Sequence, residues 1–241
     1  MKSITGLFLL LFSSQPLAFD LPPDFKASYL IEKYGSSVAE TTLTLNQTDN
    51  RISYQSSSRA IGLAAVFTSD SITESSTLKL SENNLPPFLL EYQYSRKKKP
   101  GKNQTIKITW NENSTASIIS HSHNGSTQLT ASQPLWDKLS VQLALMHDIS
   151  AAKKHDILNY KVIDKNTIID YRFEYLDDEN ISIDNRNYLT RKLKRIHASG
   201  KRTTFMWLAT ELSNLPIAIE QYKNKTTHWR MELQDINIKA N

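Results

Sequence analysis

The sequence predicts an all-β protein, mainly antiparallel, in which one strongly curved sheet or incomplete β-barrel carries a single central amphipathic helix. Three observations indicate this class. Short segments in which apolar and polar residues alternate recur along the chain, as in strands with one buried face. Turn residues separate these segments at intervals of roughly eight to twelve residues. One long segment after the N-terminal leader, residues 133–149, instead has its apolar residues at helical spacing.

The predicted helix covers about residues 135–149. Its large apolar residues lie three or four positions apart, so they form a stripe on one helical face. They are Trp136, Leu139, Leu143, Met146 and Ile149. We expect the helix on the concave side of the sheet, because an open sheet of this size needs a cover for its apolar face. The stripe then either fills the core or lines a ligand cavity.

The alternating segments form one block of strands on each side of the helix, ten or more strands in all. In the segment 167–176, Ile169, Tyr171, Phe173 and Tyr175 share one face, which we expect to be buried. Residues 60–67 are the most apolar part of the chain after the leader. Their pattern fits either a buried strand with a bulge at Gly62 or one short helical turn.

Residues 1–18 have the layout of a secretory signal peptide, with Lys2, an apolar run over 7–12 and a polar segment that ends in Ala18. The apolar run is too short to span a bilayer. The chain contains no Cys, so we expect no disulfide, no thiolate ligand and no lipid-modified Cys after the leader. We therefore predict a periplasmic protein that is not a lipoprotein and not an integral membrane protein, with residues 19–241 as a single domain.

The net charge of +5 is too small to predict nucleic-acid binding. The positive charges gather at two predicted hairpin tips. One tip carries Arg96, Lys97, Lys98 and Lys99, and the other carries Lys201 and Arg202. Such tips are either solvated surface or contacts to an anionic surface such as lipid headgroups.

No group of residues in the sequence has the pattern of a catalytic or metal site. His121 and His123 lie at a predicted turn without a nearby Cys or carboxylate. The run 177–179 is acidic but lacks the spacing of a calcium loop. Nucleophile-elbow, phosphate-loop and zinc-protease motifs are absent from the sequence. We predict no catalytic residues, no metal and no cofactor, and we favour binding over catalysis.

Several short segments and their spacing resemble one bacterial family. They are FKASY at 25–29, the pair 89–94 and 106–110, LWDKLS at 135–140, and WLA at 207–209 ahead of LPIAI at 215–219. Over about residues 25–238 the chain resembles the exported proteins that carry domain of unknown function 3108 (DUF3108). The resemblance implies a periplasmic antiparallel β protein, similar in outline to the curved half-barrels that carry lipoproteins or lipids. It implies no catalytic residue.

The function that we predict is non-enzymatic binding, with a lipid-like or apolar ligand held inside the half-barrel. A curved sheet covered by one helix leaves interior space unless long side chains fill it. We expect the cavity wall to include Trp136, Leu139, Leu143, Met146, Tyr171 and Phe173, together with Phe88 and Leu90. The alternatives are a protein-interaction or structural factor in envelope maintenance and, less favoured, a hydrolase of envelope glycans or lipids.

Overall fold

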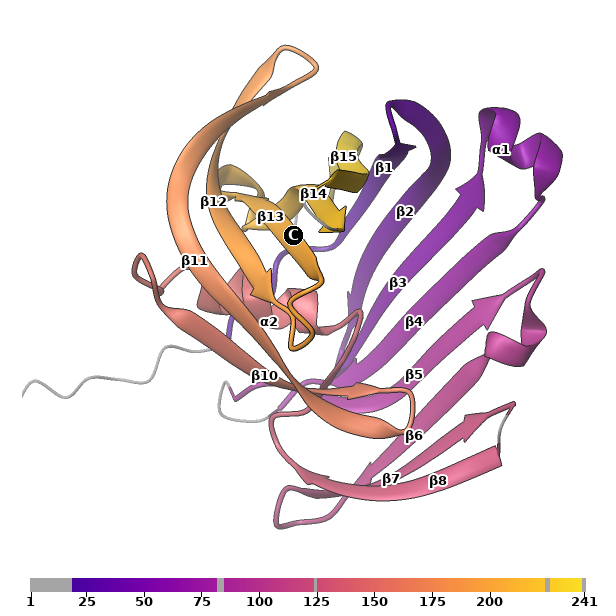
Figure 1. Cartoon of the computed structure of the whole chain (residues 1–241). Coiled ribbons are helices and arrows are strands. Elements are labelled where there is room, and N and C mark those ends of the chain that lie inside the picture. The colour runs from indigo at the N-terminus through magenta and orange to yellow at the C-terminus, as the bar shows by residue number, and fades with distance from the viewer. Residues whose placement is uncertain (1–18, 82–84, 124, 224–225, 240–241) are drawn as a thin grey trace, which may run out of the picture.

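Figure 1 shows a computed structural model of the chain, which describes residues 19–81, 85–123, 125–223 and 226–239. The expected signal peptide at 1–18 lies outside the described residues. The strands before the central helix are β1 (Phe25–Lys33), β2 (Ser36–Thr48), β3 (Arg51–Ala60), β4 (Ser71–Lys79), β5 (Phe88–Arg96), β6 (Gln104–Trp110), β7 (Thr115–Ser122), β8 (Gly125–Ser132) and β9 (Trp136–Asp137). Those after it are β10 (Ile157–Asp164), β11 (Thr167–Ile183), β12 (Arg186–Ile196), β13 (Arg202–Ala209), β14 (Leu215–Lys223) and β15 (Thr226–Ile238).

These strands form one 15-stranded sheet in the order β8-β7-β6-β5-β4-β3-β2-β1-β15-β14-β13-β12-β11-β10-β9. The first and last long strands, β1 and β15, pair in the middle of the sheet, with Phe25 opposite Ile238. The β9–β10 pair is parallel, and the long strands pair antiparallel. The sheet curls strongly on itself without closing (Figure 1). The predicted fold class, an antiparallel incomplete barrel, is confirmed.

The two arms of the sheet meet through side chains. The turn between β10 and β11 lies against β6 and β7, where the Lys165 carbonyl accepts a hydrogen bond from Gln104 Nε2 at 2.6 Å. The Ser120 hydroxyl lies within hydrogen-bond distance of the same carbonyl, at 3.0 Å, and of Asn166 Oδ1, at 2.8 Å. This contact links the two arms across the open side of the sheet.

The central helix α2 (Val141–Asp148) is shorter than predicted and lies within the curl of the sheet (Figure 1). Residues 136–137 form strand β9, and the Asp137 carboxylate then fixes a turn by accepting hydrogen bonds from the Leu139 and Ser140 amides. The helix buries Val141, Leu143, Ala144, Leu145 and Met146, which occupy more than one of its faces. The expectation of a one-sided amphipathic helix was therefore wrong, because α2 is surrounded by the core.

Residues 60–67 do not form a buried strand. The segment contains helix α1 (Gly62–Phe67), none of whose residues is buried. Gly62 has a φ of +54°, a left-handed conformation that a glycine adopts without strain, and it turns the chain out of β3 into the helix. The helical-turn alternative is confirmed, and the structure has a second helix besides α2.

Two predicted inward faces differ in the structure. On β5 the buried residues are Leu89 and Tyr92, because Leu90 is the extra residue of a β-bulge opposite Thr77 and Leu78. Phe88 instead packs edge-to-face against Trp110, with ring centroids 5.3 Å apart. On β11 the side chains of Tyr171, Phe173 and Tyr175 are buried as predicted, whereas Ile169 is 39% exposed near the start of the strand.

Connections between strands lie alternately at two ends of the sheet. One end, which we call the α1 end, carries the described connections 34–35, 61–70, 97–103, 165–166 and 197–201. The opposite end carries the described connections 49–50, 111–114, 184–185 and 210–214. This division follows from the antiparallel order and determines which loops surround each opening.

Candidate functional site: a cavity inside the curved sheet

A cavity of about 520 Å³ lies on the concave side of the sheet, between β1–β4, β14, β15 and the start of α2. We call it the central cavity. Its apolar lining consists of Ile31, Val38, Leu43, Leu139, Ile219, Trp229 and Met231. Its polar lining consists of Lys33, Thr41, Ser56, Ser58, Glu74, Lys138 and Gln142. Because Ile31, Lys33 and Val38 are close to the β1–β2 turn, the cavity extends toward the α1 end.

The sequence of β3 explains why this space is not filled. Its inward-facing residues change from large to small along the strand, from Ile52 and Tyr54, which are fully buried, to Ser56 and Ser58, which are half-buried. Large inward residues pack against α2, as the Tyr54 hydroxyl shows by donating to Gln142 Oε1 at 3.1 Å. The two serines are too short to reach the facing wall, so the cavity opens where the large residues end.

Lys138 supplies a positive charge at the polar side of the central cavity. Its Nζ lies 5.6 Å from the ring centroid of Tyr92 and 5.0 Å from that of Tyr94, so two aromatic rings contact the cation. In the part of the chain that the structure describes, no carboxylate forms an ion pair with Lys138. Lys138 also lines a neighbouring polar pocket of about 410 Å³ that contains Lys102 and Lys165. A ligand that carries an acidic group beside an apolar chain would find a counter-charge here.

The one acidic residue in the lining, Glu74, already accepts a hydrogen bond within the protein. Its Oε2 accepts a hydrogen bond of 2.6 Å from the Tyr92 hydroxyl. Burial, together with the charge of Glu74, raises the pKa of the Tyr92 phenol far above its usual value, so Tyr92 remains a donor at neutral pH. The paired carboxylate is less available to a ligand than the ammonium of Lys138.

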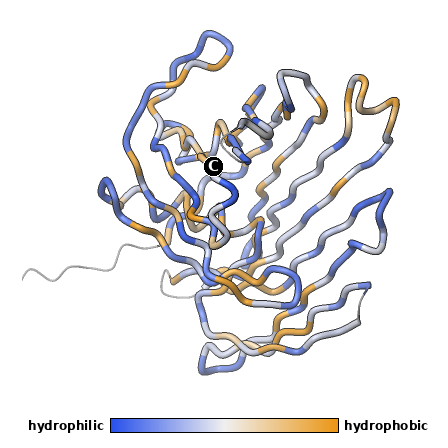
Figure 2. Tube along the Cα trace, in the orientation of Figure 1, coloured by the Kyte–Doolittle hydropathy of each residue, from blue (hydrophilic) through white to orange (hydrophobic). Residues whose placement is uncertain are grey.

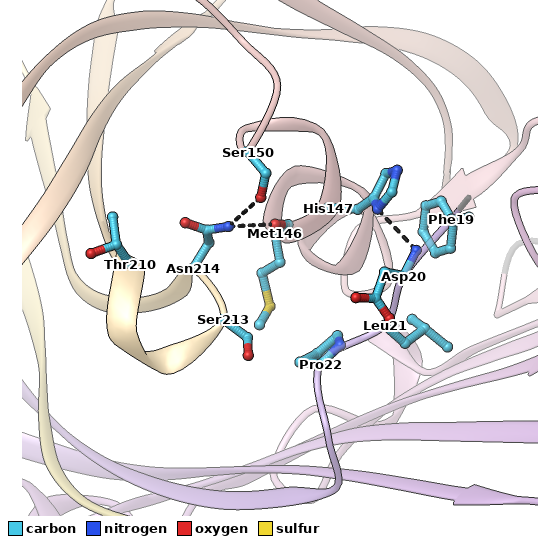
Figure 3. A pocket seen from close by; sticks show the side chains of 10 residues that line it. All are labelled: Phe19, Asp20, Leu21, Pro22, Met146, His147, Ser150, Thr210, Ser213 and Asn214. Atoms are coloured by element: carbon cyan, nitrogen blue, oxygen red, sulfur yellow. Dashed lines mark hydrogen bonds between the residues drawn. The ribbon is translucent and has the colours of Figure 1, made fainter. Parts of the chain in front are cut away.

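A second pocket, of about 590 Å³, lies where the segment 19–22 crosses α2 (Figure 3). Its polar groups form hydrogen bonds between segments that are distant in the sequence. Asn214 Nδ2 donates to the Met146 carbonyl at 2.9 Å and to Ser150 Oγ at 2.8 Å. The Asp20 amide donates to His147 Nδ1 at 3.0 Å. These hydrogen bonds fasten residues 19–22 and Asn214 to α2 and the turn after it. The described lining contains no Lys or Arg, in contrast to the central cavity.

Side chains that could hold a metal ion together do not assemble in the described residues. No group of three or more His, Asp or Glu among them is placed to hold a metal ion. Within the same residues, no helix combines the length and the apolar character needed to span a membrane. The described geometry thus provides a partly apolar cavity with a cation.

A family model described as a protein of unknown function (DUF3108) matches residues 24–225. The chain belongs to the DUF3108 family. This confirms the resemblance seen in the sequence. No curated protein matches this DUF3108 member.

Three solved structures align with this DUF3108 member, one of them with a TM-score above 0.5. A β-barrel-like protein of domain of unknown function DUF1849 from Brucella abortus aligns with a TM-score of 0.59 and 8% identity, over 91% of this chain and 99% of its own. A presumed exported protein with a YmcC-like fold from Bacteroides fragilis NCTC 9343 gives 0.42 at 8% identity, over 91% and 99%. A presumed lipoprotein from Parabacteroides distasonis ATCC 8503 gives 0.39 at 9% identity, over 92% and 100%. The first similarity supports a barrel-like fold.

The six residues expected to line a cavity occupy three environments in this DUF3108 member. Leu139 lines the central cavity, and Met146 lines the pocket at residues 19–22. The remaining four, Trp136, Leu143, Tyr171 and Phe173, are buried in the core. The central cavity therefore takes most of its wall from β1–β4, β14 and β15, which the sequence did not single out. The step from large to small residues along β3 was the available signal.

The six basic residues expected to contact an anionic surface all lie at the α1 end. Arg96 is half-buried and donates from Nε to Asp70 Oδ2 at 2.5 Å. Lys97, Lys98 and Lys99 are exposed in the β5–β6 connection, and Lys201 and Arg202 are exposed at the β12–β13 connection. Two tips separated in sequence are thus placed at the same end of the sheet.

Proposed function

We propose that this DUF3108 member is a non-enzymatic binding protein of the periplasm, which holds an acyl-chain ligand with an acidic group in the central cavity. The cavity carries the proposal, because it combines an apolar wall with the cation of Lys138. Its volume of about 520 Å³ falls within the range of roughly 300–1,000 Å³ typical of small-molecule sites. The leader-like residues 1–18 and the absence of Cys support an exported protein without a lipid anchor on Cys.

The energetics favour an apolar chain over a polar ligand. Each buried CH₂ contributes roughly 0.8 kcal/mol relative to water, so an extended chain along Leu43, Leu139 and Met231 gains from every methylene that the wall covers. The acidic group then lies near Lys138, where the ammonium has no carboxylate partner within the described residues. This geometry predicts preference for a fatty acid over the matching alcohol.

A bulky residue in place of Ser56 tests the cavity. Ser56 faces the cavity, whereas its neighbour Ser57 points to the other side of the sheet and is exposed. We expect Ser56→Phe to weaken palmitate binding by about tenfold or more, because the ring occupies the space of several methylenes. Ser57→Phe, the matched control, should bind as the wild type does. Titration calorimetry on delipidated protein measures both, and equal affinities in the two variants would contradict the assignment of the cavity.

Removing the ammonium of Lys138 tests whether the ligand's acidic group binds there. Lys138→Met keeps the length and apolar character of the side chain but removes the charge. We expect about a tenfold loss of affinity for palmitate and little change for hexadecanol, since only the carboxylate interacts with the ammonium. A parallel loss for both ligands would instead mean that Lys138 shapes the wall and does not contact an acidic group.

A further inference from the structure

Helix α1 presents three large apolar side chains to solvent. Leu63, Val66 and Phe67 are 79%, 78% and 86% exposed. Their spacing of three and four residues places them on one helical face. A helix this short is not stable by itself in water, so the folded protein holds the apolar face outward. Figure 2 shows this segment as a hydrophobic stretch at the tip of the sheet.

The backbone around α1 is anchored to the sheet. The Ile61 amide donates to the Val38 carbonyl at 3.1 Å, and the Ala60 amide donates to the Asp70 carbonyl at 3.4 Å. Thr68 closes the helix with a bond of 2.9 Å from its amide to the Ala64 carbonyl. The exposed face is thus displayed by a fixed loop and not by a chain end.

The same anchor joins α1 to a cluster of lysines. The Asp70 carboxylate accepts hydrogen bonds from the Lys98 amide, at 3.0 Å, and from Arg96 Nε, at 2.5 Å. The bond from the Lys98 amide, reinforced by Arg96, holds the pKa of Asp70 below its usual value. The Asp70 carboxylate is therefore already bonded to Arg96 and to the Lys98 amide. The side chains of Lys97, Lys98 and Lys99 are exposed and take part in no ion pair of the described chain.

The two ends of the sheet differ in charge. At the α1 end, Asp70 is the only acidic residue in the described connections 34–35, 61–70, 97–103, 165–166 and 197–201. At the opposite end, four connections each contain an acidic residue and no Lys or Arg; the residues are Asp49, Glu112, Asp184 and Glu211. The segment 149–156, which enters β10 from this end, carries Lys153 and Lys154 besides Asp156, and Lys154 is paired with Asp177. Such polarity orients a protein with its α1 end toward a negative surface.

We propose that the α1 end docks on the surface of an anionic lipid bilayer, with Leu63, Val66 and Phe67 inserted among the acyl chains and Lys97–Lys99 on the headgroups. An apolar face flanked by lysines is the composition that binds at this interface. A groove for a protein would offer concave apolar surface, whereas α1 projects from the sheet. The docking itself does not depend on a ligand. It also places the opening of the central cavity toward the bilayer, a consequence that rests on the proposed function.

Vesicle flotation of the full chain tests the docking. The wild type should float with vesicles that contain phosphatidylglycerol and much less with vesicles of phosphatidylcholine alone. We expect Leu63→Ser, Val66→Ser and Phe67→Ser together to lower the affinity on the order of 100-fold. Lys97→Glu, Lys98→Glu and Lys99→Glu together should lower it on the order of 100-fold, because each lysine near the surface contributes about fivefold and the three factors multiply. None of these side chains is buried, so we expect both variants to fold as the wild type does. Thermal unfolding checks this.

Matched variants elsewhere on the molecule serve as controls. Ile119→Ser, Ile157→Ser and Leu189→Ser remove three other exposed apolar side chains, of 43%, 41% and 46% exposure. Lys79→Glu, Lys107→Glu and Lys153→Glu make the same change of charge away from the α1 end. Both controls should keep the affinity of the wild type to within about twofold, because docking depends on place as well as composition.

Because the chain contains no Cys, a dye can be attached at one introduced Cys to measure how the protein is oriented on the bilayer. A polarity-sensitive dye on Ser69→Cys, which follows α1, should enter an apolar environment on addition of anionic vesicles, whereas the same dye on Asn50→Cys, at the opposite end, should not. Wild-type protein that fails to float, or an α1 variant that floats unchanged, overturns the docking. So does an α1 variant that only loses self-association or a protein partner. Failure of palmitate binding with intact flotation refutes the cavity but not the docking.

Discussion

Asp137 is the buried acidic residue that joins the sheet to α2. Its side chain is fully buried, and Oδ1 accepts hydrogen bonds from Ser76 Oγ and the amides of Leu139 and Ser140, while Oδ2 accepts one from Ser140 Oγ. The sequence motif at 135–140 placed Asp137 at the start of the helix. It did not indicate Ser76, which is 61 positions away, because that contact exists only after β4 and β9 have come together.

The pKa of Asp137 predicts a pH dependence of stability. Burial raises it to about 6, against hydrogen bonds from Ser140, Ser76 and Leu139 that lower it. Between the unfolded value near 4 and the folded value, the folded protein binds more protons, so this group's contribution to stability decreases as the pH rises through that window. The shift of about two units corresponds to about 3 kcal/mol.

Comparison with Asp137→Asn isolates this contribution. The asparagine keeps an acceptor for the Leu139 and Ser140 amides but does not ionise. We expect the free energy of unfolding of the wild type, relative to that of the variant, to fall by about 3 kcal/mol between pH 3.5 and pH 7. Urea unfolding at a series of pH values measures it. Parallel curves for the two proteins would mean that the hydrogen bonds offset the burial completely.

Among the elements, strands were predicted well from sequence and helices poorly. A strand with one wet face shows its alternation locally, as in 167–176, where three of the four expected residues are buried. Helix α2 has apolar residues on several faces, and its beginning competes with β9, which is held by a long-range pair between Trp136 and Val162. For residues 60–67 the sequence fitted either a buried strand or a short helical turn, and the structure has the helical turn as α1. The local sequence does not tell which elements will cover a segment, so the outward face of α1 was not predictable.

The edge strand β8 should be the least protected long strand of the sheet. It pairs with β7 only, and its residues alternate between exposed and half-buried. In contrast, β1 pairs on both sides, with β15 and β2. We expect the amides of β8 to exchange with solvent faster than those of β1, since opening an edge breaks fewer hydrogen bonds. Hydrogen exchange measured by mass spectrometry compares the two, and similar protection would indicate that β8 is covered in solution.

At the scale of the whole molecule, the sequence predicted one curved antiparallel sheet but not where its interior stays open. The central cavity requires Ser56 on β3, Ile31 on β1 and Trp229 on β15 to share one wall. These residues come together because β1, the first strand, pairs with β15, the last. No local pattern contains that pairing. The candidate lining was therefore assigned to the helix stripe and to β11, whose residues mostly fill the core.

The contact between the two arms of the sheet, where the β10–β11 turn meets β6 and β7, limits how far the circumference of the curved sheet can change. A closed barrel has a fixed circumference, because widening it means breaking a whole ladder of backbone hydrogen bonds. Here the circumference is completed by side-chain hydrogen bonds, which join Gln104 and Ser120 to Lys165 and Asn166, and Ser76 to Asp137. Breaking these bonds would leave every backbone ladder of the sheet intact. We therefore expect the interior to accept contents of different thickness more readily than the interior of a closed barrel would.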